Sequence, residues 1–373
     1  MDSTRKALTR SEVVLLLGAG ASKPLGLPLM NDFWQTVYND PFYDSTRSAL
    51  DKVKEAHNIK TAGNGYPDLE GILDLVETYY RYYEIMFNDP VVKWDIYDDE
   101  MKKYWLSPSQ EPKRKNYIQS HIKGDIELSV GIKEARDSLY RVIFREFSRS
   151  PNSIEVSHLY DPLLEMLSRR FTQQFLPVFT TNYDLVLERY GENPHVFLET
   201  GFERRGGRLI WRPSLFATFV PKGDKTTNIA LFKLHGSISW RKENGQIVDY
   251  GLFVREGPGD LALIYPTQTK EYPNEEPFKT AYRYLEDCLS NAGFLIAVGY
   301  SFRDRALNGL VKEALEKSDR LQVISISGTT SGDLETRMAQ LFGAERISLV
   351  PENFTPSSGS SYLELLRDKL FIN

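Results

Sequence analysis

The chain has 373 residues, of which 41% are hydrophobic and 12% aromatic. This apolar content supports a sizeable core, and the length predicts two domains or one large domain with an insertion. The formal net charge of -5 argues against broad binding to nucleic acid. A single cysteine, Cys288, excludes an intrachain disulfide and a cysteine-rich zinc site.

The apolar run at residues 13–17 is too short for a membrane span or for the core of a signal peptide, and the first ten residues are polar. The lone cysteine fits a reducing compartment. We therefore expect a cytoplasmic protein that contacts neither a membrane nor, directly, nucleic acid.

Five short apolar runs predict buried strands. They begin with Val13–Leu17 and continue with residues 175–179, 229–234, 294–298 and 321–326. Helical patterns lie between several of them, at residues 275–291, 304–317 and 331–342. Fully apolar strands that alternate with helices predict a Rossmann-like, doubly wound α/β sheet.

Residues 31–170 lack such strand runs and carry apolar residues at helical spacing, for example Ala135, Leu139 and Val142. They predict a mostly helical insertion subdomain after the first strand. The Rossmann-like domain then comprises residues 1–30 and 171–373. Within it, Gly206-Gly207 and Asn244-Gly245 predict small hairpins.

A glycine-rich or polar cluster directly follows each apolar run. In open parallel sheets the carboxyl ends of the strands meet at one edge, and ligands bind there. We therefore expect the five clusters to gather around one crevice. They are Gly18–Ser22, Thr180–Asp184, His235–Ser237, Gly299–Ser301 and Ser327–Thr330.

The first cluster has the pattern Gly18-x-Gly20-x-Ser22. Glycines after a buried strand allow a tight turn, and they let backbone N–H groups approach a pyrophosphate. A helix starting after the loop would add its positive dipole. The full dinucleotide pattern is not met, because Lys23 stands where the third glycine belongs. A plain strand-to-helix turn is the alternative.

Four clusters, in this order, resemble the motif set of the sirtuin family. Gly18–Ser22 with Gly26-Leu27-Pro28 resembles its GAGxS…GIP loop, and Thr180–Asp184 resembles TQNxD. His235-Gly236 resembles its HG segment, and Gly299–Ser301 resembles GTS. The resemblance covers roughly residues 11–30 and 172–330, and it implies that NAD⁺ is bound as a substrate.

Two departures narrow this resemblance. Protein deacetylases of the family usually carry four zinc-binding cysteines, which this chain lacks, so we expect no metal. Thr181 also replaces the usual glutamine, and the segments TTNYD and GYSFRD look most like bacterial sirtuin-like proteins of antiphage defence. In that group the domain hydrolyses NAD⁺.

The resemblance implies that Asn182 and His235 are catalytic. An amide can hold a water and a ribose hydroxyl together, and an imidazole can accept a proton near neutral pH. Asn182 and Asp184 also stand where helix caps are expected, which is the alternative role for both. The residues expected to bind the nucleotide are Gly18, Ala19, Gly20, Ser22, Thr181, Asp184, Gly299, Ser301, Arg303 and Ser327.

The sequence thus predicts an NAD⁺ glycohydrolase that releases nicotinamide and ADP-ribose, acting as a regulated NAD⁺-depleting effector of antiphage defence. Related systems pair such a protein with a DNA-translocase-type ATPase or an Argonaute-like protein. Two alternatives are a protein deacylase or ADP-ribosyltransferase, and a non-catalytic sensor of an ADP-ribose-type nucleotide. The cluster of Tyr and Trp at residues 79–105 predicts a homo-oligomer, against the alternative of a self-contained subdomain.

Overall fold

The computed structural model describes residues 11–29, 123–149, 151–170, 175–218, 227–252, 260–264, 274–328, 332–355 and 361–371, with a few single residues between these ranges. None of the helices described there is both long and apolar enough to cross a membrane.

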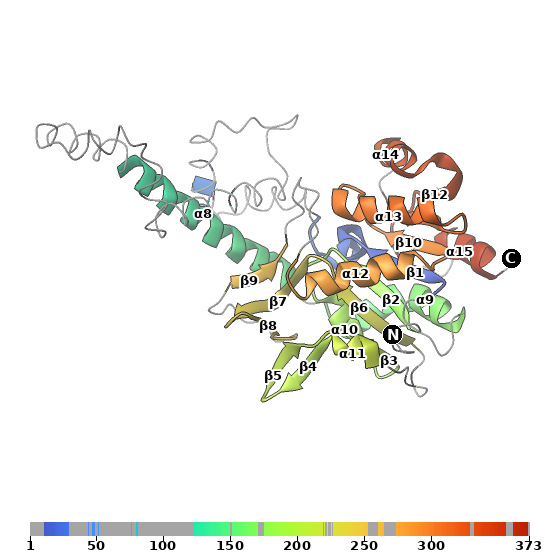
Figure 1. Cartoon of the computed structure of the whole chain (residues 1–373), viewed down its shortest axis with the longest axis horizontal. Helices are drawn as coiled ribbons and strands as arrows, with labels where there is room; N and C mark the ends of the chain where they lie inside the picture. Colours follow the sequence, from blue (N-terminus) through green and yellow to red (C-terminus); the bar gives the residue numbers. More distant parts are fainter. Residues whose placement is uncertain are drawn as a thin grey trace, which may run out of the picture. The chain divides into compact units, whose positions relative to one another are not determined.

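Seven parallel strands form the main sheet (Figure 1). In spatial order they are β12 (Ile347–Val350), β11 (Gln322–Ile326), β10 (Phe294–Val298), β1 (Val13–Leu17), β2 (Leu176–Thr180), β6 (Thr227–Lys233) and β3 (Val196–Glu199). From the central strand β1 the chain first builds the β2 side and later the β10 side. This is the predicted doubly wound, Rossmann-like arrangement, and the fold class is confirmed.

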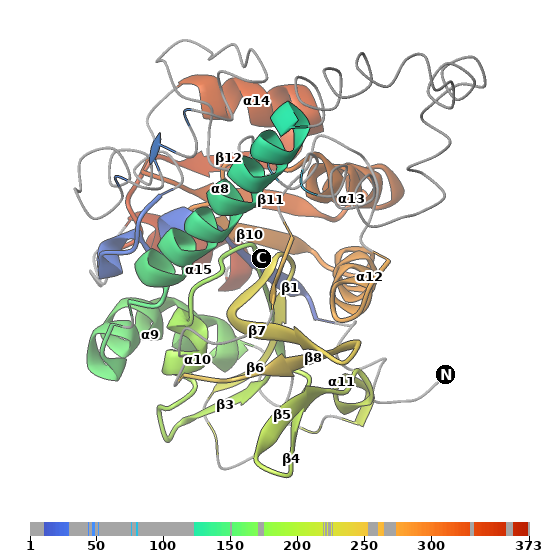
Figure 2. The ribbon, with the colours of Figure 1, turned by 90° about the vertical axis from the view of Figure 1, so that its left-hand side faces the viewer.

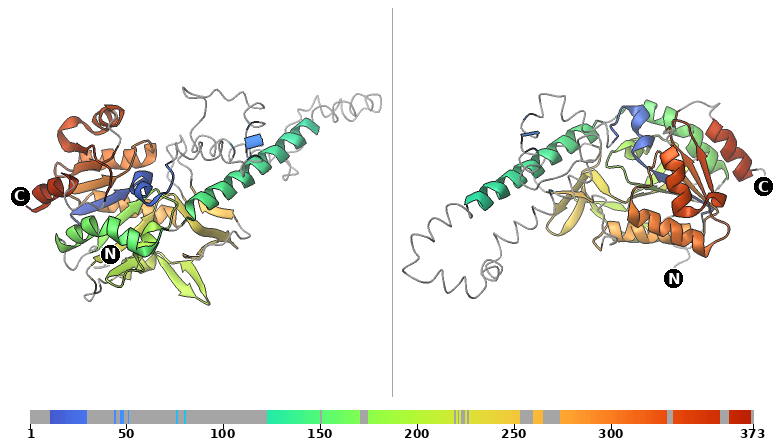
Figure 3. Two further views of the ribbon diagram at one scale, coloured as in Figure 1. Left: turned by 180° about the vertical axis from the view of Figure 1, so that it is seen from behind. Right: turned by 90° about the horizontal axis from the view of Figure 1, so that it is seen from above.

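Helices cover both faces of this sheet (Figures 2 and 3). They are α9 (Ser153–Arg170), α10 (Val186–Tyr190), α12 (Phe278–Leu289), α13 (Arg305–Lys317), α14 (Gly332–Phe342) and α15 (Ser361–Phe371). In β1, Val14 and Leu16 pack in one core with α12, α13 and α14. Val13, Leu15 and Leu17 pack in the other core with α9, α10 and α15. Because successive side chains of a strand point to opposite faces, burial on both sides requires an unbroken apolar run.

A second, antiparallel sheet contains β4 (Phe202–Arg205), β5 (Arg208–Trp211), β8 (Gln246–Asp249), β7 (Gly236–Glu243) and β9 (Asp260–Leu263) in that order. Gly206-Gly207 connects β4 to β5, and Asn244-Gly245 connects β7 to β8; all four residues have positive φ. Two consecutive positive φ values form the turn that matches the twist of paired strands. The predicted hairpins are confirmed. The short helix α11 (Ser214–Thr218) contributes the buried Phe216.

By its internal contacts the chain divides into residues 1–29 with 144–373, and residues 30–143. The predicted boundary at 170 therefore differs from the structure, because α9 belongs with the main sheet: Val156, Leu159 and Leu163 lie in one of its cores. An amphipathic pattern identifies the apolar face of a helix but not the surface that it covers. The helical pattern near residue 139 is confirmed as α8 (Lys123–Phe147), while most of residues 31–122 lie outside the described residues.

Glycines allow the loop after β1 to pack on the loop after β10. A Cβ atom on Gly18 would lie 2.6 Å from the carbonyl oxygen of Gly299, and one on Gly20 would lie 2.7 Å from the Cα of Gly299. Gly299 itself has φ +60°, and a Cβ there would overlap the backbone of Gly20 and Ala21. The two loops are thus in backbone contact that no side chain can enter.

We expect Gly299→Ala to lower the free energy of unfolding by about 3 kcal/mol or more, since it combines left-handed strain with a backbone clash. Gly26→Ala is the matched control: Gly26 lies in the left-handed region, with φ +80° and ψ +12°, but has nothing within 4 Å of an added Cβ. It should cost only the strain, about 1–2 kcal/mol. Denaturant unfolding of both variants measures the difference, and equal losses would contradict the proposed backbone contact.

Candidate functional site

The carboxyl ends of the main strands are aligned in one row. Pairing joins Lys233 to Thr180, Thr180 to Leu17, and Leu17 to Val298. The row continues from Val298 to Ile326. Four of the five polar clusters begin one or two residues past this row, and the cluster Thr180–Asp184 begins in it, as the sequence predicts. Thr329 and Thr330 of the last cluster lie outside the described residues.

Most backbone N–H groups of the glycine-rich loop donate hydrogen bonds to carbonyl groups of the protein itself. Gly18 donates to the carbonyl of Val298 at 2.9 Å, and Gly20 donates to that of Gly299 at 3.0 Å. Ser22 also donates, to Ala19. Between residues 18 and 22, all of which the structure describes, only the N–H of Ala19 has no backbone partner. The chain here forms two 3-10 helices of three residues each, Ala19–Ala21 and Lys23–Leu25. Among the residues described directly after the loop there is thus no α-helix whose dipole could point at a pyrophosphate.

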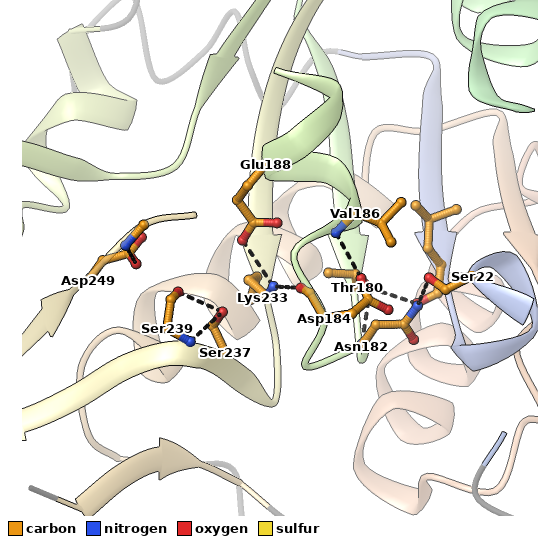
Figure 4. A network of polar contacts seen from close by, with 12 residues as sticks. Ser22, Thr180, Asn182, Asp184, Val186, Glu188, Lys233, Ser237, Ser239 and Asp249 are labelled. Carbon is orange, nitrogen blue, oxygen red and sulfur yellow. Dashed lines mark hydrogen bonds and ion pairs between the residues drawn. The ribbon is translucent and has the colours of Figure 1, made fainter. Parts of the chain in front are cut away.

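Asn182 ties its own turn to the glycine-rich loop (Figure 4). Its Nδ2 donates to the carbonyl of Gly18 at 3.0 Å and to Oγ of Ser22 at 3.1 Å. Its backbone N–H donates to Oγ1 of Thr180 at 3.0 Å. The alternative of a helix cap is wrong for Asn182, because the residue at the cap of α10 is Leu185. Among the described residues, Oδ1 of the half-buried Asn182 accepts no hydrogen bond, so this oxygen is the free acceptor of the turn.

Asp184, by contrast, makes a hydrogen bond within its own turn. Its carboxylate is buried and Oδ1 accepts from the backbone N–H of Val186 at 3.1 Å, at the start of α10. Beside it Tyr160 of α9 donates to the carbonyl of Ala21 at 3.2 Å. Burial, and then the charge of Asp184, raise the pKa of Tyr160, while the Ser22 hydroxyl opposes the shift. Because the phenol of Tyr160 stays protonated, it is a constant hydrogen-bond donor to Ala21 of the glycine-rich loop.

His235 lies where β6 leaves the main sheet and β7 begins. Its position is set on both sides, since Leu234 donates to the carbonyl of Thr180 and Ile264 donates to the carbonyl of His235, each at 2.8 Å. Gly236 follows with φ +91°, and a Cβ there would collide with the carbonyl of Ala262. The HG pair is therefore a sharp exit from the sheet, and His235 is only 3% exposed.

The ring of His235 is hydrogen-bonded to Asp304, with 2.8 Å between Nε2 and Oδ2. Asp304 caps α13 at the same time: its Oδ1 accepts from the N–H groups of Ala306 at 2.9 Å and Leu307 at 3.0 Å. Burial by itself would raise the pKa of Asp304, but the contacts with His235 and with these two N–H groups lower it overall. Asp304 therefore both caps α13 and contacts His235.

The loop from Gly299 to Asp304 alternates between buried and exposed side chains. Tyr300 and Phe302 are buried, whereas Ser301 and Arg303 are exposed. Phe302 has φ +52°, which is rare for a bulky residue and marks a strained turn. Ser301 and Arg303 are thus open to solvent just past the end of β10. Ser327, at the end of β11, is 8% exposed and donates its N–H to Val350.

A buried lysine secures the Asn182 turn from the other side (Figure 4). Lys233, the last residue of β6, donates from Nζ to the carbonyl of Asp184 and to Oε1 of Glu188 on α10 at 2.9 Å. Their side chains are 3% and 11% exposed. Burial raises the pKa of Glu188, and the Lys233 ammonium opposes that shift. The lysine therefore fastens the turn to the end of β6, two residues before His235.

Comparison with known proteins identifies this part of the chain. A model of the SIR2-like domain family matches residues 177–342. Residues 177–342 are therefore similar to a SIR2-like domain. The matched range includes Asn182, His235 and Asp304, while β1 and the glycine-rich loop lie before it. No curated protein is detectably similar in sequence.

Solved structures of Sir2 proteins are similar to the chain at low identity. One, described as a Sir2 homologue in complex with NAD, has 12% identity and a TM-score of 0.41 and covers 98% of this chain and 93% of its own. A Sir2 homologue complex with ADP-ribose has 11% identity and a TM-score of 0.41, with coverages of 100% and 99%. A third, from work on the mechanism and regulation of Sir2 enzymes, has 13% identity, a TM-score of 0.39, and coverages of 98% and 95%.

Two residues of the SIR2-like domain escaped the sequence interpretation. Neither Asp304 nor Lys233 is among the site residues expected from the sequence. A lysine inside the apolar run 229–234 was the available signal, because a buried charge requires a partner. Across the described part of the chain, no group of three or more His, Cys, Asp and Glu could hold a metal ion.

We expect Lys233→Met to lower the free energy of unfolding by about 3 kcal/mol or more, because the Glu188 carboxylate stays buried without its cation. Adding Glu188→Gln should restore much of the loss. The matched control is Lys242→Met, whose partner Glu275 lies at 2.7 Å but in an exposed pair. Removing such a surface pair should change stability little. Equal losses for the two lysines in denaturant unfolding would show that the Lys233 pair does not secure the turn.

Proposed function

We propose that the protein is an NAD⁺ glycohydrolase that converts NAD⁺ and water into nicotinamide and ADP-ribose. The observation that carries the proposal is the hydrogen bonding of Asn182 to the glycine-rich loop, in the same row of strand ends that holds His235. Asn182 and the loop therefore form one unit with a free amide oxygen. The Sir2 homologue solved with NAD is consistent with the substrate class.

The reaction needs little nucleophilic force. The bond between C1′ of the ribose and the nicotinamide nitrogen breaks, and its electron pair leaves with nicotinamide as a neutral group. A water oxygen bonds to C1′, and one proton of that water is released. The protein has to orient the ribose and place the water on the opposite face.

The residues divide this work. Oδ1 of Asn182 accepts a hydrogen bond from the water or from a ribose hydroxyl. His235 accepts the proton. Ser301 and Arg303, exposed beside the loop, bind the phosphates, and the N–H of Ala19 is the loop donor open to them. Gly18, Gly20, Ser22 and Gly299 shape the binding surface. Thr181 and Ser327 complete it, and the buried Asp184 supports it by fixing the start of α10.

Burial of His235 fits an enzyme that is held in check. The ring is 3% exposed, so the substrate reaches it only after part of its cover moves. We propose that a trigger drives this opening and that the active protein depletes NAD⁺ in antiphage defence. The resemblance of TTNYD and GYSFRD to such proteins supports this role, with a DNA-translocase-type ATPase or an Argonaute-like protein as the kind of partner. The missing zinc cysteines disfavour a protein deacylase.

Asn182→Ala and His235→Ala should each lower the rate of nicotinamide release about a hundredfold or more, because each removes a group that acts in the transition state. Chromatography of NAD⁺ reactions, with and without candidate partners, measures the rate. Matched controls are Asn291→Ala and His158→Ala, which change exposed residues outside the row of carboxyl ends: Asn291 precedes the start of β10, and His158 lies in α9. These should keep wild-type turnover.

The outcomes separate the candidate functions. Near-wild-type turnover of a folded Asn182 or His235 variant would rule out this pair as catalytic. Binding of NAD⁺ by the wild type without nicotinamide release under any of the conditions would favour the nucleotide sensor. Transfer of the ADP-ribosyl or acyl group to a protein would favour the deacylase or ADP-ribosyltransferase.

We further propose that the protein works as a homo-oligomer through the aromatic segment 79–105, which lies almost wholly outside the described residues. Clusters of Tyr and Trp are typical of interfaces. Light scattering at micromolar concentration should give a mass above 42.9 kDa. A monomeric mass with and without NAD⁺ would contradict this proposal and assign regulation to a partner protein.

A further inference from the structure

We propose that Asp304 is a positioning residue that fixes the tautomer of His235, so that Nδ1 is the atom that accepts the proton. The role of Nδ1 in catalysis rests on the function proposed above. The assignment of the tautomer does not, because it follows from the contact between the two side chains.

For the neutral ring, the contact leaves one arrangement of protons. Oδ2 of Asp304 lies 2.8 Å from Nε2 of His235, and both side chains are buried. Oδ1 of the same carboxylate accepts from two backbone N–H groups of α13, which holds the carboxylate ionised and its orientation fixed. An ionised carboxylate only accepts hydrogen bonds. Nε2 must therefore carry a proton, and the lone pair of the neutral ring stands on Nδ1.

The second function of Asp304 explains why an aspartate stands there. Its cap fixes the carboxylate at the start of a 13-residue helix, and the strained Phe302 two residues earlier directs the chain to that point. Asn308 donates to the carbonyl of Phe302 at 2.9 Å and locks the turn. The direction in which the ring faces is thus set by α13, an element of the sheet half that does not contain β6.

Two substitutions distinguish this role from capping. Asn and Ser cap helices about as well as Asp. In Asp304→Asn the amide NH₂ would face Nε2 and donate to it, which moves the ring proton to Nδ1. In Asp304→Ser the contact is lost and the tautomer is left free. We therefore expect Asn, although nearly isosteric, to lower kcat about a hundredfold or more and more strongly than Ser, with KM for NAD⁺ changed less than kcat. A purely structural role predicts the opposite order.

The ring can be observed directly. Two-bond nitrogen–proton NMR spectra of the full chain labelled at its five histidines report the tautomer of each ring, and His235→Gln assigns the signal. We expect Nε2–H in the wild type, Nδ1–H in Asp304→Asn, and no change in the surface control Asp319→Asn. Nδ1–H in the wild type, or an unchanged tautomer in both Asp304 variants, would overturn the proposal. The expected spectra from a protein that never cleaves NAD⁺ would instead overturn the proposed function while Asp304 keeps its positioning role.

Discussion

The backbone contact between the loop after β1 and Gly299 is the constraint on which the rest of the site depends. It joins the loops that follow β1 and β10, without any side chain between them. Between these two strands the order in which the chain adds strands to the sheet reverses. Because Gly18 is fixed there, its carbonyl offers a defined acceptor to Asn182. The turn that follows β2 is thereby placed against a loop that belongs to a neighbouring strand.

Buried charge is the second organising feature. Lys233 is paired with Glu188, and His235 is paired with Asp304, each at an end of a strand or helix. Such pairs cost desolvation and contribute little net stability. Their value lies in geometry: the first holds the Asn182 turn to β6, and the second holds the His235 ring to α13. A packed apolar contact would allow rotations that these directional contacts exclude.

Directional hydrogen bonds fix the glycine-rich loop in the same way. Its N–H groups are largely engaged within the protein, so a nucleotide would meet the free amide oxygen of Asn182, the N–H of Ala19 and the exposed side chains of Ser301 and Arg303. Recognition is thus assigned to a few outward groups on a rigid edge. The ring that would accept the proton lies inward, under cover.

Local patterns determined the parts of this protein that local physics controls. The apolar run 13–17 predicted a strand buried on both faces, and Asn244-Gly245 predicted a hairpin, because burial and turn geometry constrain neighbouring residues directly. The convergence of polar clusters at one edge also followed, since parallel strands end together. Only the tertiary structure decided which groups come into contact. Asn182 is hydrogen-bonded to Gly18, 164 residues earlier in the sequence, and His235 to Asp304, 69 residues later. It also decided that α9 covers the sheet, because an amphipathic helix can bury its apolar face against any surface that the fold presents.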